Sequence, residues 1–258
     1  MTKTGGETFY SEYLKLDALL AVQALRSDQP DELQFIIVHQ VHELWFKLAL
    51  NELTRARDAL QTDSILDAAR LLGQVVEIFR NLRGATEQLQ SLPPMAFHTF
   101  RKFLATGSGM QSFQFREIEF LLGNRAPKHI AWVKNLFAGD RHLGQIVARL
   151  DEPSLADALA GVLPRHGIAD WAALYAHPER CPELYALADV LSALEQQVIL
   201  WRMAHMQLVE RTIGAATIGT GGTAHAYLQR AAQARFFPEL WEARNELSRR
   251  VDAGQGLE

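Results

Sequence analysis

Apolar residues recur at helical spacing along most of this chain, and this periodicity constrains the fold more than any other feature. Between residues 31 and 60 the recurring positions are three to five residues apart and draw one stripe along a helix. The stripe consists of Leu33, Ile37, Val41, Leu44, Leu48 and Leu53. Asp31 directly follows Pro30 and stands where a helix N-cap is expected. We therefore predict a long helix over about 31–60.

Similar patterns predict the other elements. Helices are expected over 64–92, 94–105, 110–123, 182–213 and 224–248, with short helices and loops over 124–180. Ser64 and Asp67 have the spacing of a capping pair at the start of the second helix. Neither strand alternation nor a hairpin signal stands out. The prediction is an all-α fold, a helical bundle with additional short helices that forms a single domain over 1–258.

Composition excludes several classes of protein. The chain has 258 residues, 48% of them hydrophobic, and a formal net charge of -4 without a long run of Lys or Arg, which argues against a nucleic-acid partner. No window approaches the roughly 18 to 20 apolar residues of a membrane span, and the N-terminus lacks a signal-peptide pattern. Cys181 is the single cysteine, so no intrachain disulfide can form. We expect a cytoplasmic protein that does not associate with membranes.

Several common site types do not match the sequence. No histidine follows a glutamate at the Glu-x-x-His spacing of di-iron bundles. The HExxH pattern of zinc proteases fails because Phe46 stands where the second histidine is needed. One cysteine cannot build a thiolate zinc or iron–sulfur site. The "GTGG" at 219–222 has no preceding strand and no Walker lysine.

Four polar residues in apolar surroundings remain as candidates, and each has more than one interpretation. His39 and His42, in "FIIVHQVHELWF", are either a metal-binding pair or helix residues of structural or catalytic use. His205, in "LWRMAHMQLVERTIG", is either an axial haem ligand or a buried core histidine. Arg101 lies among phenylalanines, where it either covers the core edge with its stem or binds a carboxylate.

Four sequence blocks, taken together and in order, resemble the tryptophan 2,3-dioxygenase family of haem enzymes. They are "FIIVHQVHELWFKLALNEL", "FRKFLATGSGMQSFQFREIEFLLGN", "LWRMAHMQLVERTIG" and "GTGGTAHAYLQRA", and the N-terminal "YSEYLKLDALL" is similar as well. The resemblance implies one haem b per subunit, bound in a pocket that the helices enclose. It also implies insertion of O2 across the indole C2–C3 bond of L-tryptophan to give N-formylkynurenine, the first step of tryptophan catabolism by the kynurenine route. The implied assembly is a homotetramer in which residues 1–30 pack on a neighbouring subunit.

The resemblance also implies roles for individual residues. His205 would be the proximal ligand of the haem iron, and His39 would be the catalytic histidine that contacts the indole nitrogen on the distal side. Phe35 would pack on the indole, and Arg101 would pair with the substrate carboxylate. The other implied substrate-binding residues are Phe97, Leu104, Ser108 and Thr220, together with Tyr10, Tyr13 and Leu14 of a neighbouring subunit. His42 and Glu43 are expected on the other face of the helix.

The sequence departs from the family pattern at three places. Phe97 stands where some members carry tyrosine, the loop before Thr220 looks one residue longer, and the segment 126–190 is short for the family. Two alternatives therefore accompany the implied function. One is a related haem enzyme that oxidises another indole or aromatic amino acid, and the other is a haem sensor without turnover.

Overall fold

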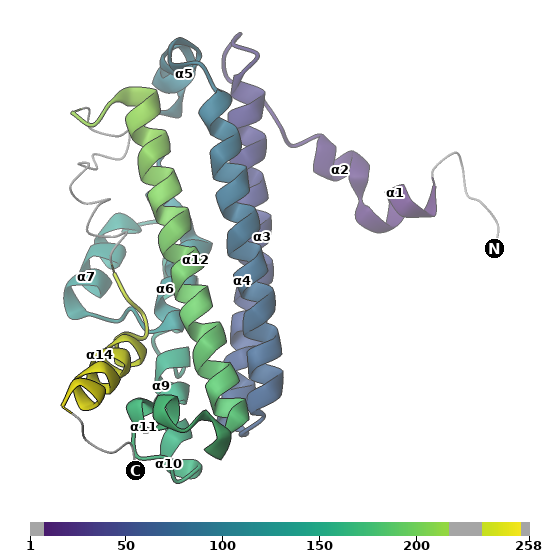
Figure 1. The fold of residues 1–258 in the computed structure, drawn as a ribbon. Coiled ribbons are helices and arrows are strands. Elements are labelled where there is room, and N and C mark those ends of the chain that lie inside the picture. Colours follow the sequence, from purple (N-terminus) through teal and green to yellow (C-terminus); the bar gives the residue numbers. More distant parts are fainter. Residues whose placement is uncertain (1–7, 217–233, 254–258) are drawn as a thin grey trace.

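The computed structural model describes residues 8–216 and 234–253, and the described part is built from helices without a strand (Figure 1). Three long helices lie side by side: α3 (Glu32–Gln61), α4 (Ile65–Gln88) and α12 (Pro182–Ile213). The helix α4 packs against both of the others. This arrangement confirms the predicted all-α class.

Shorter helices lie at both ends and along one side of these three, and the first two of the chain project away from the bundle (Figure 1). In chain order they are α1 (Phe9–Leu14), α2 (Leu16–Leu20), η1 (Leu89–Ser91), α5 (Pro94–Arg101), η2 (Lys102–Leu104), η3 (Gly109–Gln111), α6 (Phe113–Leu122), α7 (Pro127–Leu136), α8 (Leu143–Ala148), α9 (Leu155–Ala160), α10 (Val162–Arg165), α11 (Trp171–Ala176), η4 (Pro178–Arg180) and α14 (Pro238–Asp252).

The main core lies where α4 meets α3 and α12. Phe79 and Leu72 of α4, Leu53 of α3 and Leu187 and Leu191 of α12 are completely buried and belong to one apolar cluster. The buried residues of α4 recur every three or four positions, which places them on one side of the helix. Burying this apolar surface holds the three long helices together.

Most predicted helix boundaries agree with the structure, and the exceptions have local causes. The helix α12 runs from Pro182 to Ile213 as predicted and stops at Gly214, whose φ is 80°. The predicted capping pair is wrong, because the Ser64 side chain makes no capping hydrogen bond. The helix expected over 64–92 gives way after Gln88 to the 3-10 turn η1, and the one expected over 94–105 ends as η2.

The last helix of the described chain begins later than the sequence predicts. In the structure α14 covers Pro238–Asp252, and proline suits the first turn of a helix because the amide hydrogen it lacks would have no partner there. Of the predicted range 224–248, residues 224–233 lie outside the described residues.

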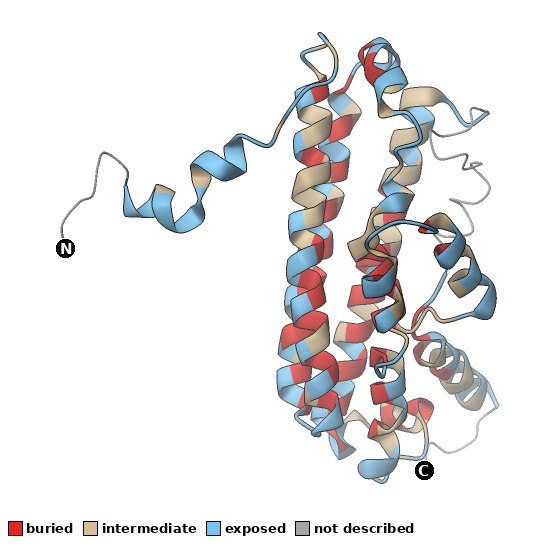
Figure 2. Ribbon diagram, turned by 180° about the vertical axis from the view of Figure 1, so that it is seen from behind, coloured by how far each residue is buried: buried red, intermediate tan, exposed pale blue. Residues whose placement is uncertain are grey.

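The predicted apolar stripe of α3 mostly faces away from the core. Leu33, Ile37, Leu44 and Leu48 are exposed, and we call these four residues the outer α3 face. Helices α1 and α2 extend away from the bundle, bury none of their residues and carry further exposed apolar side chains (Figure 2). Across residues 8–216 and 234–253, no helix combines the length and apolar character that a membrane crossing requires.

Candidate functional site

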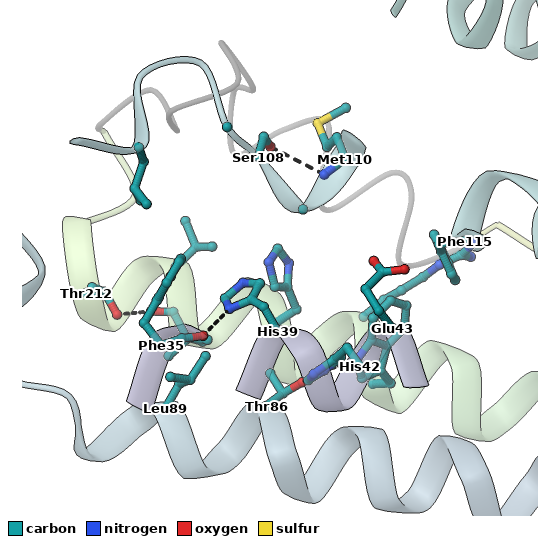
Figure 3. Close-up of a pocket in the computed structure, with 18 of the residues that line it drawn as sticks. Phe35, His39, His42, Glu43, Thr86, Leu89, Ser108, Met110, Phe115 and Thr212 are labelled. Atoms are coloured by element: carbon teal, nitrogen blue, oxygen red, sulfur yellow. Dashed lines mark hydrogen bonds between the residues drawn. The ribbon is translucent and has the colours of Figure 1, made fainter. Parts of the chain in front are cut away.

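The first half of α3, α5 with the loop that follows it, α6 and the second half of α12 enclose a cavity of ≈ 280 Å³. Its lining is mainly apolar and aromatic, with a few polar groups among these side chains. Figure 3 shows Phe35, His39 and Glu43 rising from α3 on one side, with Ser108 and Met110 opposite them. Such a lining is typical of a small-molecule site, where the polar groups fix the orientation of a ligand.

His39 presents an unprotonated nitrogen to this cavity. Its Nδ1 lies 2.7 Å from the carbonyl oxygen of Phe35, which can only accept, so Nδ1 carries the proton. Burial lowers the pKa of His39 below its ordinary value, although the bond to Phe35 and the charge of Glu43 oppose this shift. The imidazole is therefore neutral at pH 7, and Nε2 is a hydrogen-bond acceptor.

Phe35 stands beside His39 and forms an aromatic wall of the cavity. Its ring centroid is 4.1 Å from that of His39, 5.9 Å from that of Phe97 and 5.4 Å from that of Phe100. Phe100 is completely buried beneath them. Because these contacts fix the ring of Phe35 from several sides, it can serve as a rigid packing surface for a planar ligand.

The segment after Phe100 supplies polar groups to the opposite side of the cavity. Arg101 ends α5 and lines the cavity together with Leu104 and Ser108. The hydroxyl of Ser108 accepts a bond of 3.3 Å from the amide of Met110, so this side chain also shapes its own turn. Gly107 is required there, since a Cβ would lie 2.9 Å from the carbonyl oxygen of Leu104.

His205 lines the cavity from α12. Burial lowers its pKa to about 4, and the nearby His39 and His42 contribute to the shift. Within the described residues, no hydrogen bond holds either nitrogen of this imidazole. A neutral imidazole with an uncommitted nitrogen facing a cavity is the form in which histidine binds a metal ion.

His42 does not lie on the other face of α3, contrary to expectation, and both it and Glu43 line the cavity. The Nδ1 of His42 donates to the carbonyl of Val38 at 2.7 Å, and its Nε2 lies 3.0 Å from the hydroxyl of Thr86. Burial lowers the pKa of His42 to about 4. Nε2 of His42 also accepts a hydrogen bond of 3.4 Å from the indole N–H of Trp201, so the two histidines are not arranged to chelate a metal between them.

Charged residues form one wall of the cavity at the α6 end. Glu119 lies 2.7 Å from Arg116 and 3.2 Å from Arg202, and His129 approaches it at 3.1 Å. Burial opposes ionisation of Glu119, but the two guanidinium groups and the hydrogen bond with His129 outweigh it and hold the pKa of Glu119 below the ordinary value. The Nε of Arg116 is buried without a hydrogen-bond acceptor in the described part of the chain. This wall can therefore receive an additional anionic group.

The structure brings most of the residues implied by the resemblance to one cavity. Its lining includes Phe35, His39, Phe97, Arg101, Leu104, Ser108 and His205. Tyr10, Tyr13 and Leu14 are instead exposed on α1, away from the cavity of their own chain, and Thr220 lies outside the described residues.

Sequence reasoning missed His42, Glu43 and the charged wall. A signal for the wall exists in the sequence, because Arg116 and Glu119 are three residues apart in the otherwise apolar "SFQFREIEFLL". Charged residues at that spacing in a buried helix are expected to pair with each other.

Comparison with known proteins decides the family. The model of the tryptophan 2,3-dioxygenase family matches residues 1–170 and 169–247. The chain belongs to the tryptophan 2,3-dioxygenase family. The tryptophan 2,3-dioxygenase of a Bradyrhizobium species (strain BTAi1) is 38% identical over 265 residues, which cover 94% of each chain. Those of Ralstonia pickettii and Bacillus cereus are 37% and 36% identical, over 92% of this chain and 92% of each relative.

Family membership confirms the resemblance found in the sequence, and members of the tryptophan 2,3-dioxygenase family depend on haem. The residues present fit such a group on two counts. His205 offers an uncommitted imidazole at the cavity, and Arg116 has a buried nitrogen without an acceptor at the charged wall. The first suits an axial ligand of iron, and the second suits a carboxylate of the porphyrin edge.

Proposed function

We propose that this protein is a haem-dependent dioxygenase that inserts both atoms of O2 across the C2–C3 bond of L-tryptophan and forms N-formylkynurenine. The observation that carries this proposal is the placement of an acceptor nitrogen on His39 and an uncommitted imidazole on His205 at the same cavity, beside Phe35. Together they provide a site for an indole N–H and a site for iron. The identity of the relatives supports the same reaction.

His205 would bind the iron of one haem b per subunit through its imidazole, and Arg116 and Arg202 would receive the carboxylate groups of the haem. Haem, when bound, supplies a ferrous iron that activates O2. The protein keeps His205 neutral by burial, and this neutral form is the one able to bind iron. The aromatic lining excludes water and strengthens every polar contact made inside the cavity.

L-tryptophan would be oriented by three groups. Its indole would pack on Phe35, its N–H would donate to Nε2 of His39, and its carboxylate would pair with Arg101. Leu104 and the ring of Phe97 would complete the apolar wall. Because Phe97 carries no hydroxyl, more of the carboxylate recognition falls on Arg101 and, by the family resemblance, on Thr220.

In this arrangement His39 orients the indole by accepting its hydrogen bond. The bond to Phe35 fixes the tautomer, so Nε2 faces the substrate without its own proton. Holding the ring in one pose relative to the iron lowers the entropic part of the barrier. His39 contributes through position, and this role requires no net proton transfer from the substrate.

The decisive experiment follows product formation. The full chain is loaded with haem, reduced, and mixed with O2 and L-tryptophan, and N-formylkynurenine is measured by absorbance and mass. A histidine-ligated haem spectrum without product would overturn the proposed reaction. Parallel reactions with substituted tryptophans and with tyrosine would then identify a related enzyme, and no turnover of any of them would indicate a sensor.

The iron ligand is tested separately. The His205→Ala variant is expected to lose stable haem binding, whereas His98→Ala, which changes an exposed histidine of α5, should bind haem as the wild type does. A normal histidine-ligated spectrum for His205→Ala would show that another residue binds the iron.

We further propose that the protein is a cytoplasmic homotetramer in which α1 and α2 pack on a neighbouring subunit. Phe9, Tyr10 and Tyr13 are 77%, 67% and 74% exposed, and the outer α3 face is exposed as well. Apolar side chains exposed in such numbers are typical of a surface that another protein covers. The Leu44→Lys variant of the outer α3 face should sediment as a smaller species, whereas Leu66→Lys on α4 should remain tetrameric. A wild-type monomer in sedimentation would overturn this assembly.

A further inference from the structure

A second group of potential ligands lies far from the cavity, at the opposite end of the bundle (Figure 1). His166 follows α10, Cys181 directly precedes α12, and Glu183 lies in the first turn of that helix. One ligand atom from each of the three lies within 4.8 Å of the other two. Cys181, at the start of α12, is 24 positions before His205 of that helix, which corresponds to about 36 Å at 1.5 Å per residue. The group is therefore separate from the proposed haem site.

The imidazole of His166 is oriented by a carboxylate on its far side. Its Nε2 lies 3.1 Å from Asp63, and Arg165 holds the same carboxylate at 3.0 Å. A carboxylate accepts a proton, so it favours the tautomer with hydrogen on Nε2. The other nitrogen, Nδ1, then carries a lone pair, which accepts a hydrogen bond from the thiol of Cys181 at 3.7 Å. A carboxylate behind a histidine is the usual outer partner of a metal-binding imidazole.

We propose that His166, Cys181 and Glu183 form a zinc site. A thiolate, an imidazole and a carboxylate are the three ligand types that Zn²⁺ takes in proteins, whereas Mg²⁺ and Ca²⁺ take oxygen ligands. One cysteine is enough for this site, because an imidazole nitrogen and a carboxylate oxygen supply the other two protein ligands. Glu183 is exposed, so water can reach the fourth tetrahedral position.

Binding of Zn²⁺ at this site releases one proton. Cys181 loses its thiol proton to solvent as the sulfur–zinc bond forms, and His166 and Glu183 contribute lone pairs. The ion then joins the end of α10 to the start of α12, two segments whose ligands are 15 residues apart in the chain. Since the unfolded chain does not hold these atoms together, zinc is expected to stabilise the fold.

The test measures zinc in the haem-loaded full chain. After equilibrium dialysis against Zn²⁺ at a free concentration set by a metal buffer, we expect one zinc per chain in addition to the haem iron. X-ray absorption at the zinc edge, where iron does not contribute, should show one sulfur at about 2.3 Å and nitrogen or oxygen neighbours at about 2.0–2.2 Å. A zinc spectrum without a sulfur shell would overturn the site, and so would the absence of stoichiometric zinc.

Variants assign the ligands. Cys181→Ser, His166→Gln and Glu183→Gln should each weaken zinc binding at least tenfold, and Asp63→Asn, which removes the outer carboxylate, by about 10- to 100-fold. The matched controls are His177→Gln and Glu179→Gln, a histidine and a carboxylate four and two positions before Cys181. If the controls weaken binding as much as the ligand variants, the assignment is wrong. Should Cys181→Ser fail to fold, the sulfur shell of the wild-type protein decides the question alone.

Discussion

His42 is expected to make the folded state sensitive to acid. Burial lowers its pKa to about 4, whereas an unfolded chain gives histidine about 6.5. The unfolded state therefore binds this proton more readily than the folded state, and stability decreases as pH falls below about 6.5. The stability that the neutral His42 contributes is fully present above about pH 6.5 and fully lost below about pH 4.

The size of the effect follows from these two values. The complete loss, about 2.5 pKa units at 1.36 kcal/mol each, is roughly 3 kcal/mol. At pH 5 the folded imidazole is still mostly neutral while the unfolded one is almost entirely protonated, which gives a loss of about 2 kcal/mol relative to pH 7. A change of that size is a substantial part of the 5–15 kcal/mol by which a protein is usually stable.

The assay compares unfolding by urea at pH 7, 6 and 5 in the wild type and in His42→Gln, at equal haem content. Glutamine can keep a hydrogen bond toward Thr86 but does not titrate. The free energy of unfolding should fall between pH 7 and 5 by about 2 kcal/mol more in the wild type than in the variant. His98→Gln, in which an exposed imidazole is lost, controls for the removal of a histidine as such. Parallel pH profiles for wild type and His42→Gln would refute the reasoning.

Three further predictions follow from single contacts. Arg101→Ala should weaken L-tryptophan binding by about 10- to 100-fold, because charge-assisted hydrogen bonds contribute about 1.5–3 kcal/mol. Equilibrium titration measures the affinity, and an unchanged value would exclude the role of Arg101 in carboxylate binding. Glu195 is completely buried and accepts hydrogen bonds from the amides of Phe236 and Phe237 and from Trp241. Glu195→Gln should thus destabilise the protein by about 1–3 kcal/mol in urea, because the amide nitrogen of glutamine cannot accept a hydrogen bond, and an unchanged stability would contradict this. Gly123→Ala should lower the melting temperature, because the φ of 114° disfavours a residue with a side chain and the new Cβ would lie 2.7 Å from the Cβ of Ala156. An unchanged melting temperature would show that the backbone around residue 123 adapts.

Periodicity predicted the helices well where capping is local, but it did not predict which side of a helix is buried. Pro182 and Gly214 delimit α12 through their own backbone properties, so these limits were readable from the sequence. The periodic stripe of α3 contains Leu33, Ile37 and Leu44, which are exposed, whereas Phe46 and Leu50 outside the stripe are buried. Both sides of α3 are apolar, and the positions of α4, α6 and α9 decide which one is covered.

The cavity could be predicted only through the family resemblance. The residues that line the cavity are spread along the chain between residue 35 of α3 and residue 213 of α12, and no spacing rule relates positions so far apart. Residue patterns alone left His205 undecided between a haem ligand and a core histidine. The structure shows that it faces a cavity without a hydrogen-bond partner in the described residues, which a core histidine would require.

His39 and His42 show why the local sequence could not separate their roles. Each donates from Nδ1 to the carbonyl four residues earlier, at 2.7 Å in both cases, so their local geometry is the same. Three residues of helix rotate one side chain by about 60° from the other. That rotation brings Nε2 of His42 against Thr86 of α4 and leaves Nε2 of His39 at the cavity. The chemical difference between the two histidines therefore arises from the packing of α3 on α4. Nε2 of His42 contacts core residues, and Nε2 of His39 remains available to a ligand.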